Sequence, residues 1–213
     1  MATGAPPSGI VPLPVHLAVV TVDSAAGTTF LDTVCGSGSA EVRLDNAVLR
    51  LFLVTYESGQ EGVLDRALAA ADGVALLVSH ADAISMDNLK SAYRALPADL
   101  PTAMLILRDA GKVEFKLSCP ACGQKLWVRD EDQGRAGRCP HCKKTFVLPG
   151  QAAHIRSLLM LPDNVPLVTV TQGHQGACRG PIAALGERTR MRAQVLKSAT
   201  MRVQVTDTAA GDT

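Results

Sequence analysis

Four cysteines carry the clearest chemistry in this sequence. They form two Cys-x-x-Cys pairs, Cys119 with Cys122 and Cys139 with Cys142, separated by residues 123–138. Each pair places two thiolates on one tight turn, and this spacing is typical of a site for one tetrahedral Zn²⁺. We expect residues 123–138 to form a β-hairpin that brings the two turns together. Because four sulfur ligands leave no position for a reactive water, the predicted metal is structural.

The residues around the two pairs support this interpretation. Gly123 follows the first pair, where the chain must turn sharply, and residues 125–128 and 145–148 have the composition of short strands. With Cys-Pro-x-Cys at both turns, residues 115–149 resemble a zinc ribbon, and the resemblance implies one structural zinc ion. The alternative is two unrelated pairs that form disulfides or act in redox chemistry. The acidic residues 130–132 are predicted to form a solvated turn at the ribbon tip.

The length and composition of the chain indicate which classes of protein it can belong to. The 213 residues fit one α/β domain with a small module, and 47% hydrophobic residues support a packed core. A net charge of +1 gives no general attraction to nucleic acid or anionic lipid. No apolar run has the length of a membrane span, and the start lacks the basic residues of a secretory signal. Cysteines in a zinc pattern indicate a reducing compartment, so we expect a cytoplasmic protein; Cys35 and Cys178 are interpreted as small packing residues.

Outside the cysteine module, apolar runs alternate with helical stripes. Near-continuous apolar runs predict buried strands at residues 15–22, 74–78, 102–107 and 165–170. A strand at 40–44 is expected to turn at Asp45-Asn46 into a longer strand at 48–54. Helices are predicted at residues 60–71, 83–96, 152–161 and 181–197, the second with a stripe of Ile84, Leu89, Tyr93 and Leu96. This alternation predicts an α/β fold with a doubly wound, mainly parallel sheet.

One segment carries a likeness to a known family. Ser58-Gly59-Gln60-Glu61-Gly62 follows the long strand, and a Leu-rich helix then leads to Ala71-Asp72-Gly73 and a buried strand. In order and spacing this resembles a Ras-like small GTPase. The resemblance implies a P-loop NTPase-like domain at residues 15–111 and 151–202. The zinc ribbon would then be an insertion at 112–150, with flexible tails at 1–14 and 203–213.

The nucleotide motifs of that family are altered in this chain. The phosphate-binding loop corresponds to residues 22–29, where Gly27 and Thr29 match but Thr28 replaces the phosphate-binding lysine. Asp23 adds negative charge at the same turn. Tyr56 replaces the aspartate that helps to hold Mg²⁺, although Gly59 and the water-orienting Gln60 are present.

The base-reading motifs are missing as well. Residues 107–112 lack the Asn-Lys-x-Asp sequence, and Thr171-Gln172-Gly173 stands where Ser-Ala-Lys is expected. The resemblance therefore implies no catalytic residues, with Gln60 vestigial, and no binding of GTP or GDP. The vestigial nucleotide-binding positions are Gly27, Thr28, Thr29 and Gly59.

These observations favour an inactive GTPase-like scaffold that binds protein partners: a small GTPase, its regulator or another copy of the chain. Its working surface is expected on the rim formed by residues 57–62 and the ribbon. One alternative is an atypical GTPase or nucleotide-binding protein that uses the helix start at Gly27 as an anion site. Others are a receiver-like or Rossmann-like domain, or a ribbon that binds nucleic acid. Arg188 and Arg192 share a helix face, either solvated or facing an acidic partner.

Overall fold

The computed structural model describes residues 14–36, 40–44, 47–79, 83–108, 114–171 and 173–208. The main sheet and its helices comprise β1 (Pro14–Thr21), α1 (Ser24–Cys35), β2 (Glu41–Arg43), β3 (Val48–Thr55), α2 (Glu61–Ala69), β4 (Gly73–Val78), α3 (Ala83–Ala95), β5 (Thr102–Arg108), α4 (Gln151–Leu159), β10 (Leu167–Thr171) and α5 (Gln175–Thr208). Between β5 and α4 lie β6 (Glu114–Ser118), β7 (Lys125–Arg129), the 3-10 helix η1 (Asp130–Asp132), β8 (Ala136–Arg138) and β9 (Thr145–Val147).

The six-stranded sheet has the order β10-β5-β4-β1-β3-β2. Every neighbouring pair is parallel except β2 with β3, which is antiparallel. All six residues of β4 and the first six of β5 are buried, which explains their uninterrupted apolar sequences. The predicted α/β fold with a mainly parallel sheet is therefore confirmed. The Asp45-Asn46 turn lies outside the described residues, but the β2–β3 pairing around it is present.

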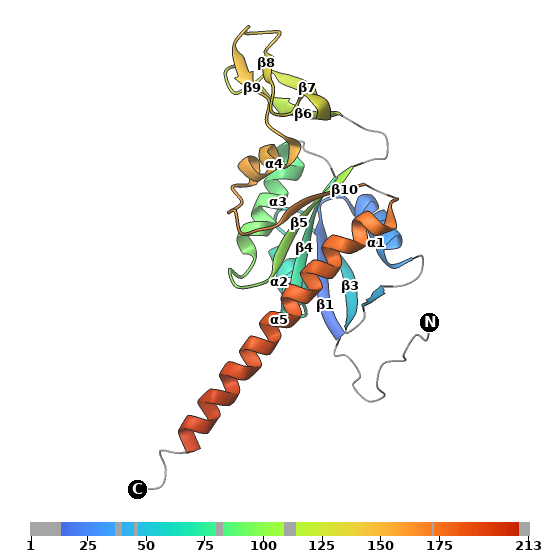
Figure 1. Ribbon diagram of the computed structural model, residues 1–213, viewed down its shortest axis with the longest axis vertical. Coiled ribbons are helices and arrows are strands. Elements are labelled where there is room, and N and C mark those ends of the chain that lie inside the picture. The colour runs from blue at the N-terminus through green and yellow to red at the C-terminus, as the bar shows by residue number, and fades with distance from the viewer. Residues whose placement is uncertain are drawn as a thin grey trace, which may run out of the picture.

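Two helical layers cover the sheet (Figure 1). On one face α1 and α5 pack through Phe30, Val34, Ile182 and Leu185. On the other face α2, α3 and α4 pack through Leu64, Leu89, Ala92, Ile155 and Leu159. The sheet thus has a core on each side, as expected for strands that are joined by crossover helices.

Two helices differ from the prediction. At α3 the predicted stripe is confirmed at Leu89, which is buried, and at Tyr93 and Leu96, which pack partly against the core. Ile84 was wrongly included, since it is 76% exposed, and Met86 and Ala92 are buried beside Leu89. Helix α5 begins at Gln175, before Pro181, because buried Cys178 and Ile182 hold its first turns against the core. It continues to Thr208, well past the predicted end at residue 197. No helix among the described residues is long and apolar enough to cross a membrane.

The segment that holds β6 to β9, residues 114–147, is called the ribbon below. The ribbon and the end of α5 project from opposite ends of the domain (Figure 1). β6 to β9 follow the carboxyl end of β5 and form two separate two-stranded sheets, β6-β7 and β8-β9. The parallel register of β1, β3, β4, β5 and β10 brings their carboxyl ends to one edge. The start of α1, the turn after β3 and the ribbon insertion therefore all leave from this edge.

Candidate metal centre and the carboxyl edge of the sheet

Each cysteine pair lies in the turn of its own hairpin. At the first turn the Gly123 N–H donates to the Cys119 carbonyl at 2.9 Å, and at the second the Lys143 N–H donates to the Cys139 carbonyl at 3.0 Å. Gly123 and Lys143 occupy equivalent positions with positive φ, 73° and 62°. The expectation of a hairpin within residues 123–138 was wrong, because β7 pairs with β6 and β8 pairs with β9.

The four sulfur atoms converge where the two hairpin turns meet. All four Sγ atoms lie within 4.8 Å of one another. The Cys119–Cys142 and Cys122–Cys139 Sγ–Sγ distances are both 3.8 Å. A tetrahedral zinc ion with metal–sulfur distances of about 2.3 Å requires sulfur–sulfur edges of about 3.8 Å, whereas a disulfide would bring two sulfurs to about 2 Å. None of the six cysteines forms a disulfide, and the site can therefore hold one structural metal ion such as Zn²⁺.

The surroundings act in opposite directions on two of the four thiols. At Cys122 a backbone hydrogen bond from Gln124 lowers the pKa, but burial and hydrogen bonds with neighbouring thiols outweigh it and raise the pKa to about 12. The pKa of Cys139 lies below its ordinary value because the backbone N–H of Cys142 donates to its sulfur, with a further contribution from His141. His141 stands in the second turn but is not a member of the sulfur cluster. The four ligands are all cysteine, so no protein position is left open for substrate or a reactive water.

The ribbon has only a small apolar core. Phe115, Leu117 and Val128 are its buried members, and Leu126, Phe146 and Leu148 pack partly against them. Three buried side chains cannot offset the conformational entropy of more than thirty ordered residues, at about 1–2 kcal/mol each. The ribbon is therefore expected to depend on its metal.

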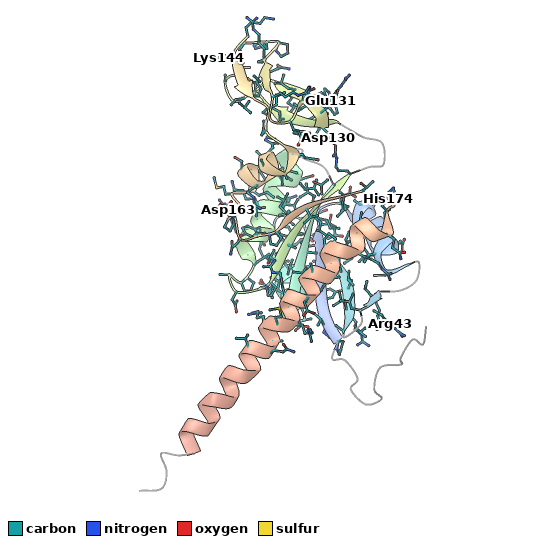
Figure 2. The ribbon with its side chains drawn as sticks, viewed as in Figure 1. Arg43, Asp130, Glu131, Lys144, Asp163 and His174 are labelled. Atoms are coloured by element: carbon teal, nitrogen blue, oxygen red, sulfur yellow. The ribbon has the colours of Figure 1, made fainter. Side chains whose placement is uncertain are left out.

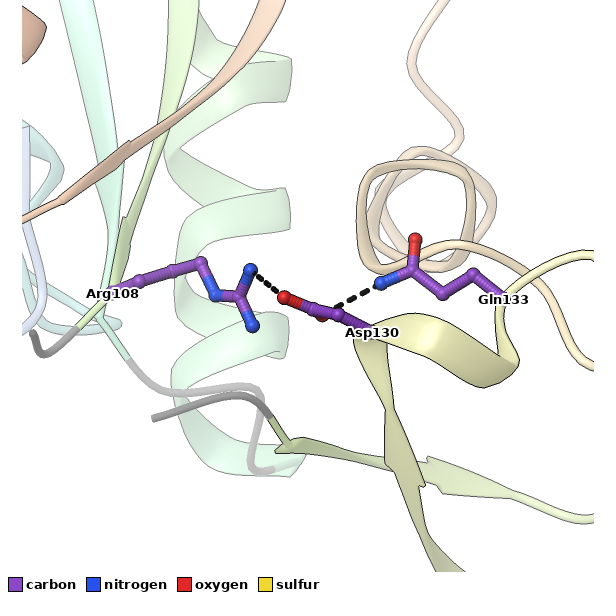
Figure 3. Close-up of polar contacts among 3 residues, drawn as sticks. All are labelled: Arg108, Asp130 and Gln133. Carbon is purple, nitrogen blue, oxygen red and sulfur yellow. Dashed lines mark hydrogen bonds and ion pairs between the residues drawn. The ribbon is translucent and has the colours of Figure 1, made fainter. Parts of the chain in front are cut away.

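An ion pair connects the ribbon to the main sheet. Arg108, the last residue of β5, pairs with Asp130 of η1, and the Gln133 side-chain amide donates to Asp130 Oδ1 at 2.7 Å (Figure 3). Asp130 was predicted in a solvated turn at the ribbon tip, and this was wrong. Figure 2 shows Asp130 near the junction with the domain, whereas Lys144 lies toward the far end of the ribbon. Neither partner is fully exposed: the Arg108 side chain is 19% exposed and that of Asp130 is 34% exposed.

Replacing Arg108 should loosen the ribbon without releasing its metal. We expect Arg108→Ala to weaken the junction by about 1–2 kcal/mol, because a charge-assisted and partly buried contact is lost. Small-angle X-ray scattering should then show a broader distribution of distances at unchanged zinc content. Arg135→Ala is the matched control, since Arg135 pairs with Asp132 within the ribbon. Identical scattering from both variants would mean that Arg108 does not hold the ribbon.

At the start of α1 the chain supplies its own anion. Asp23 caps the helix: its Oδ1 accepts from the Ala26 N–H at 3.0 Å, and its Oδ2 accepts from the Ser79 hydroxyl at 3.1 Å. The Thr28 and Thr29 hydroxyls donate to carbonyls within α1, at Ser24 and Ala25. Both hydroxyls are therefore used by the helix itself.

Gly27 has a packing role at the same place. A Cβ at this position would lie 2.5 Å from Leu53 Cδ1 and 2.8 Å from Thr21 Cγ2. The glycine lets α1 approach β1 and β3 closely. This packing role accounts for Gly27 without a bound phosphate. The sequence indicated the negative charge of Asp23, but the contact with Ser79 joins residues 56 positions apart and had no local signal.

The turn after β3 is organised around Tyr56. Tyr56 is 1% exposed and packs in the core on the α2–α3 side. Burial raises the pKa of its phenol, and the charge of Glu61 and a hydrogen bond to it raise the pKa further. Glu61 Oε1 also accepts from the Gly59 N–H at 3.2 Å, and Gly59 has φ 90°, which favours glycine. Gln60 is exposed at the start of α2.

The remaining candidate residues have partners within the chain. Arg192 pairs with Asp99, and exposed Arg188 donates to the Thr102 carbonyl at 3.4 Å, so both side chains have contacts within the chain. Cys178 is buried in the core, and its thiol faces the Thr171 carbonyl at 3.6 Å. Cys35 packs at the edge of the same core. Residues 109–113 and Gln172, within the two missing base-reading motifs, lie outside the described part of the chain.

Comparison with known proteins adds no family to this description. No protein-family model matches the chain, and no curated protein matches it either.

Proposed function

We propose that this chain is a catalytically inactive, GTPase-like scaffold that binds protein partners and is stabilised by a structural zinc ribbon. The observation that carries the proposal is the Asp23 carboxylate, which caps α1 where a nucleotide phosphate would have to bind.

The strand order supports the GTPase-like part of the proposal. The parallel strands alone, in the order β3-β1-β4-β5-β10, would also fit a receiver-like domain. The antiparallel strand β2, paired with β3 at the edge, is absent from an all-parallel receiver-like sheet and is expected for a Ras-like one. The order also differs from the Rossmann arrangement, in which three consecutive strands lie side by side on one half.

The charge at the former phosphate site argues against nucleotide binding. A helix N-terminus attracts anions through its free N–H groups and its dipole. In this chain the Asp23 carboxylate already satisfies that preference, and Thr28 stands where the family has a lysine. A triphosphate would meet a fixed negative charge and lack its principal cation, so the residues present do not fit GTP.

The former metal position argues in the same direction. Tyr56 stands where the family has an aspartate for Mg²⁺, and its phenol is buried against Glu61. A neutral phenol with a raised pKa is a poor ligand for Mg²⁺, which prefers carboxylates, phosphates and water. Gln60, exposed at the start of α2, therefore has no metal or phosphate to work with.

The proposed partners are proteins: a small GTPase, its regulator, or a second copy of this chain. The turn after β3, the capped start of α1 and the ribbon leave from the same edge of the sheet, which supports a binding surface on this rim. The Arg108–Asp130 contact would hold the ribbon in one orientation relative to this rim. A preorganised ribbon would lose less entropy when a partner binds.

A turnover assay tests the proposal. We expect the zinc-loaded protein to release no phosphate from GTP above the buffer rate, with Mg²⁺ present. Gln60→Leu should give the same result, because Gln60 has no catalytic role here. Mg²⁺-dependent hydrolysis that disappears in Gln60→Leu would refute the proposal and support an active, atypical GTPase.

A further inference from the structure

The single tryptophan of the chain is exposed on the ribbon. Trp127, in the middle of β7, is 64% exposed, although tryptophan usually buries most of its surface. The side chains on the same face of the β6-β7 hairpin are also exposed and mostly basic. We call this surface the Trp127 face; it consists of Lys116, Ser118, Lys125, Trp127 and Arg129, and the strand register places Glu114 opposite Arg129 on the same face.

We propose that the Trp127 face binds an extended, acidic protein segment that pairs with β7 as an additional strand. This inference rests on the proposed protein-binding function and specifies the partner surface and its chemistry. The segment would present an acidic, an apolar and an acidic residue at every second position.

The inner side of the hairpin fixes this face in place. Leu117, Leu126 and Val128 point into the ribbon core, so the alternate residues of both strands must point outward. Lys116 lies directly opposite Trp127, with its ammonium nitrogen 4.5 Å from the centre of the indole ring. This cation–π contact holds the ring in a defined position.

The backbone of β7 is ready to accept another strand. Hydrogen-bonded and non-hydrogen-bonded pairs alternate in an antiparallel ladder. The Cys119 N–H donates to the Gln124 carbonyl at 2.8 Å, so Cys119 and Gln124 form a hydrogen-bonded pair. Counting along the register from this pair, Ser118–Lys125, Lys116–Trp127 and Glu114–Arg129 are non-hydrogen-bonded pairs. The N–H and C=O groups of Lys125, Trp127 and Arg129 therefore point to the outer edge of β7. No strand among the described residues pairs with them there, although the Gln124 side-chain amide donates to the Lys125 carbonyl at 3.4 Å.

The basic side chains of β7 favour an acidic segment as the strand added at this edge. A strand added to β7 would place its side chains beside Lys125, Trp127 and Arg129, within reach of cross-strand contacts. Carboxylates opposite Lys125 and Arg129 would be favourable, and an apolar side chain opposite Trp127 would cover the indole. Arg129 pairs with Glu131 at 3.5 Å and has a further interaction within the chain, so a partner carboxylate would compete with these contacts at Arg129.

The same residues disfavour the other occupants. A second copy pairing symmetrically through Trp127 would set Lys125 against Arg129, and like charges opposite each other destabilise a sheet. Nucleic acid needs many phosphate contacts and stacking surfaces. The Trp127 face presents one aromatic ring, and a lysine covers one side of that ring.

Labelled peptides test this proposal on the full-length, zinc-loaded protein. The probe is a nine-residue peptide with glutamate, valine and glutamate at alternate central positions, and its partner peptide has glutamine for both glutamates. We expect saturable binding of the acidic peptide, with a blue shift of Trp127 fluorescence, and at least tenfold weaker binding of the glutamine peptide. Methylating the backbone nitrogens that face β7 should also abolish binding, because strand pairing needs them.

Protein variants locate the surface. The double variant Lys125→Glu with Arg129→Glu, and separately Trp127→Ser, should each weaken binding at least tenfold at unchanged zinc content. Arg43→Glu with Lys144→Glu is the control: it makes the same change in charge at exposed positions away from the Trp127 face and should bind normally. Equal binding of both peptides, equal loss in the control, or tighter binding of an oligothymidylate at this face would overturn the proposal.

The outcome can be separated from that of the proposed function. If the acidic peptide fails to bind while GTP binding and turnover are absent, the scaffold function stands and its partner surface lies elsewhere. If the peptide binds and GTP is hydrolysed, the Trp127 face stands and the inactive-scaffold function falls.

Discussion

Replacing Cys139 by serine is expected to unfold the ribbon and leave the main sheet folded. Cys139 is one of four sulfur atoms that lie within 4.8 Å of one another. Structural zinc contributes on the order of 10 kcal/mol to the folding of small zinc modules. The ribbon core contains three fully buried side chains, which cannot replace that contribution. The two cores of the main sheet contain no ribbon residue, so they should survive.

Two measurements follow this change separately. Elemental analysis should give about one zinc per wild-type chain and much less for Cys139→Ser. Fluorescence of Trp127, the one tryptophan, reports the ribbon, while far-UV circular dichroism reports the sheet and its helices. Cys35→Ser is the matched control, because Cys35 lies outside the sulfur cluster and should keep the metal. Cooperative loss of both signals in Cys139→Ser would show instead that the ribbon is an integral part of the main fold.

Replacing Tyr56 by the aspartate that Ras-like small GTPases have at the corresponding position is expected to destabilise the domain and not to create a metal site. Tyr56 is 1% exposed and fills the core beside α2. Tyr56→Asp would leave a cavity and bury a carboxylate near Glu61, at a cost of at least about 3 kcal/mol. Tyr56→Phe is the matched control, which loses only the hydrogen bond to Glu61, worth about 1 kcal/mol.

Urea unfolding at pH 7 measures both differences, and nucleotide binding should be absent in both variants. The wild type should also lose stability above about pH 10 relative to Tyr56→Phe. Its phenol has a raised pKa in the folded state, so the unfolded chain releases that proton first as the pH rises. A stable Tyr56→Asp protein with Mg²⁺-dependent GTP binding would instead reveal a latent nucleotide site.

Local sequence signals predicted the central strands of the main sheet and the cysteine cluster. The strand predicted as buried at residues 165–170 is the edge strand β10, in which Val170 is the one buried residue. Strands β4 and β5 are buried on both faces and have uninterrupted apolar sequences, so they can be predicted without the structure. The two Cys-x-x-Cys pairs determine their own turns through short-range backbone hydrogen bonds, so their convergence followed from spacing. In both cases the information lies within a few neighbouring residues.

Features that depend on distant partners were not predicted. Asp130 had the sequence context of a solvated acidic turn, but it pairs with Arg108 at the end of β5. Arg192 pairs with Asp99 of the same chain, 93 positions away, which no local pattern indicated. Helix α5 starts before Pro181, because core contacts of Cys178 and Ile182 outweigh the helix-breaking tendency of proline. Tertiary contacts decide each of these, and a local pattern cannot show them.

Isothermal titration of the zinc-loaded protein with GTP, GDP and ATP, each with Mg²⁺, tests the central claim most directly. The Asp23 cap, Thr28 in place of lysine and the buried Tyr56 predict no saturable heat with any of the three at millimolar nucleotide. Saturable, Mg²⁺-dependent binding of GTP or GDP in the micromolar range would contradict the account and make this chain a nucleotide-binding protein.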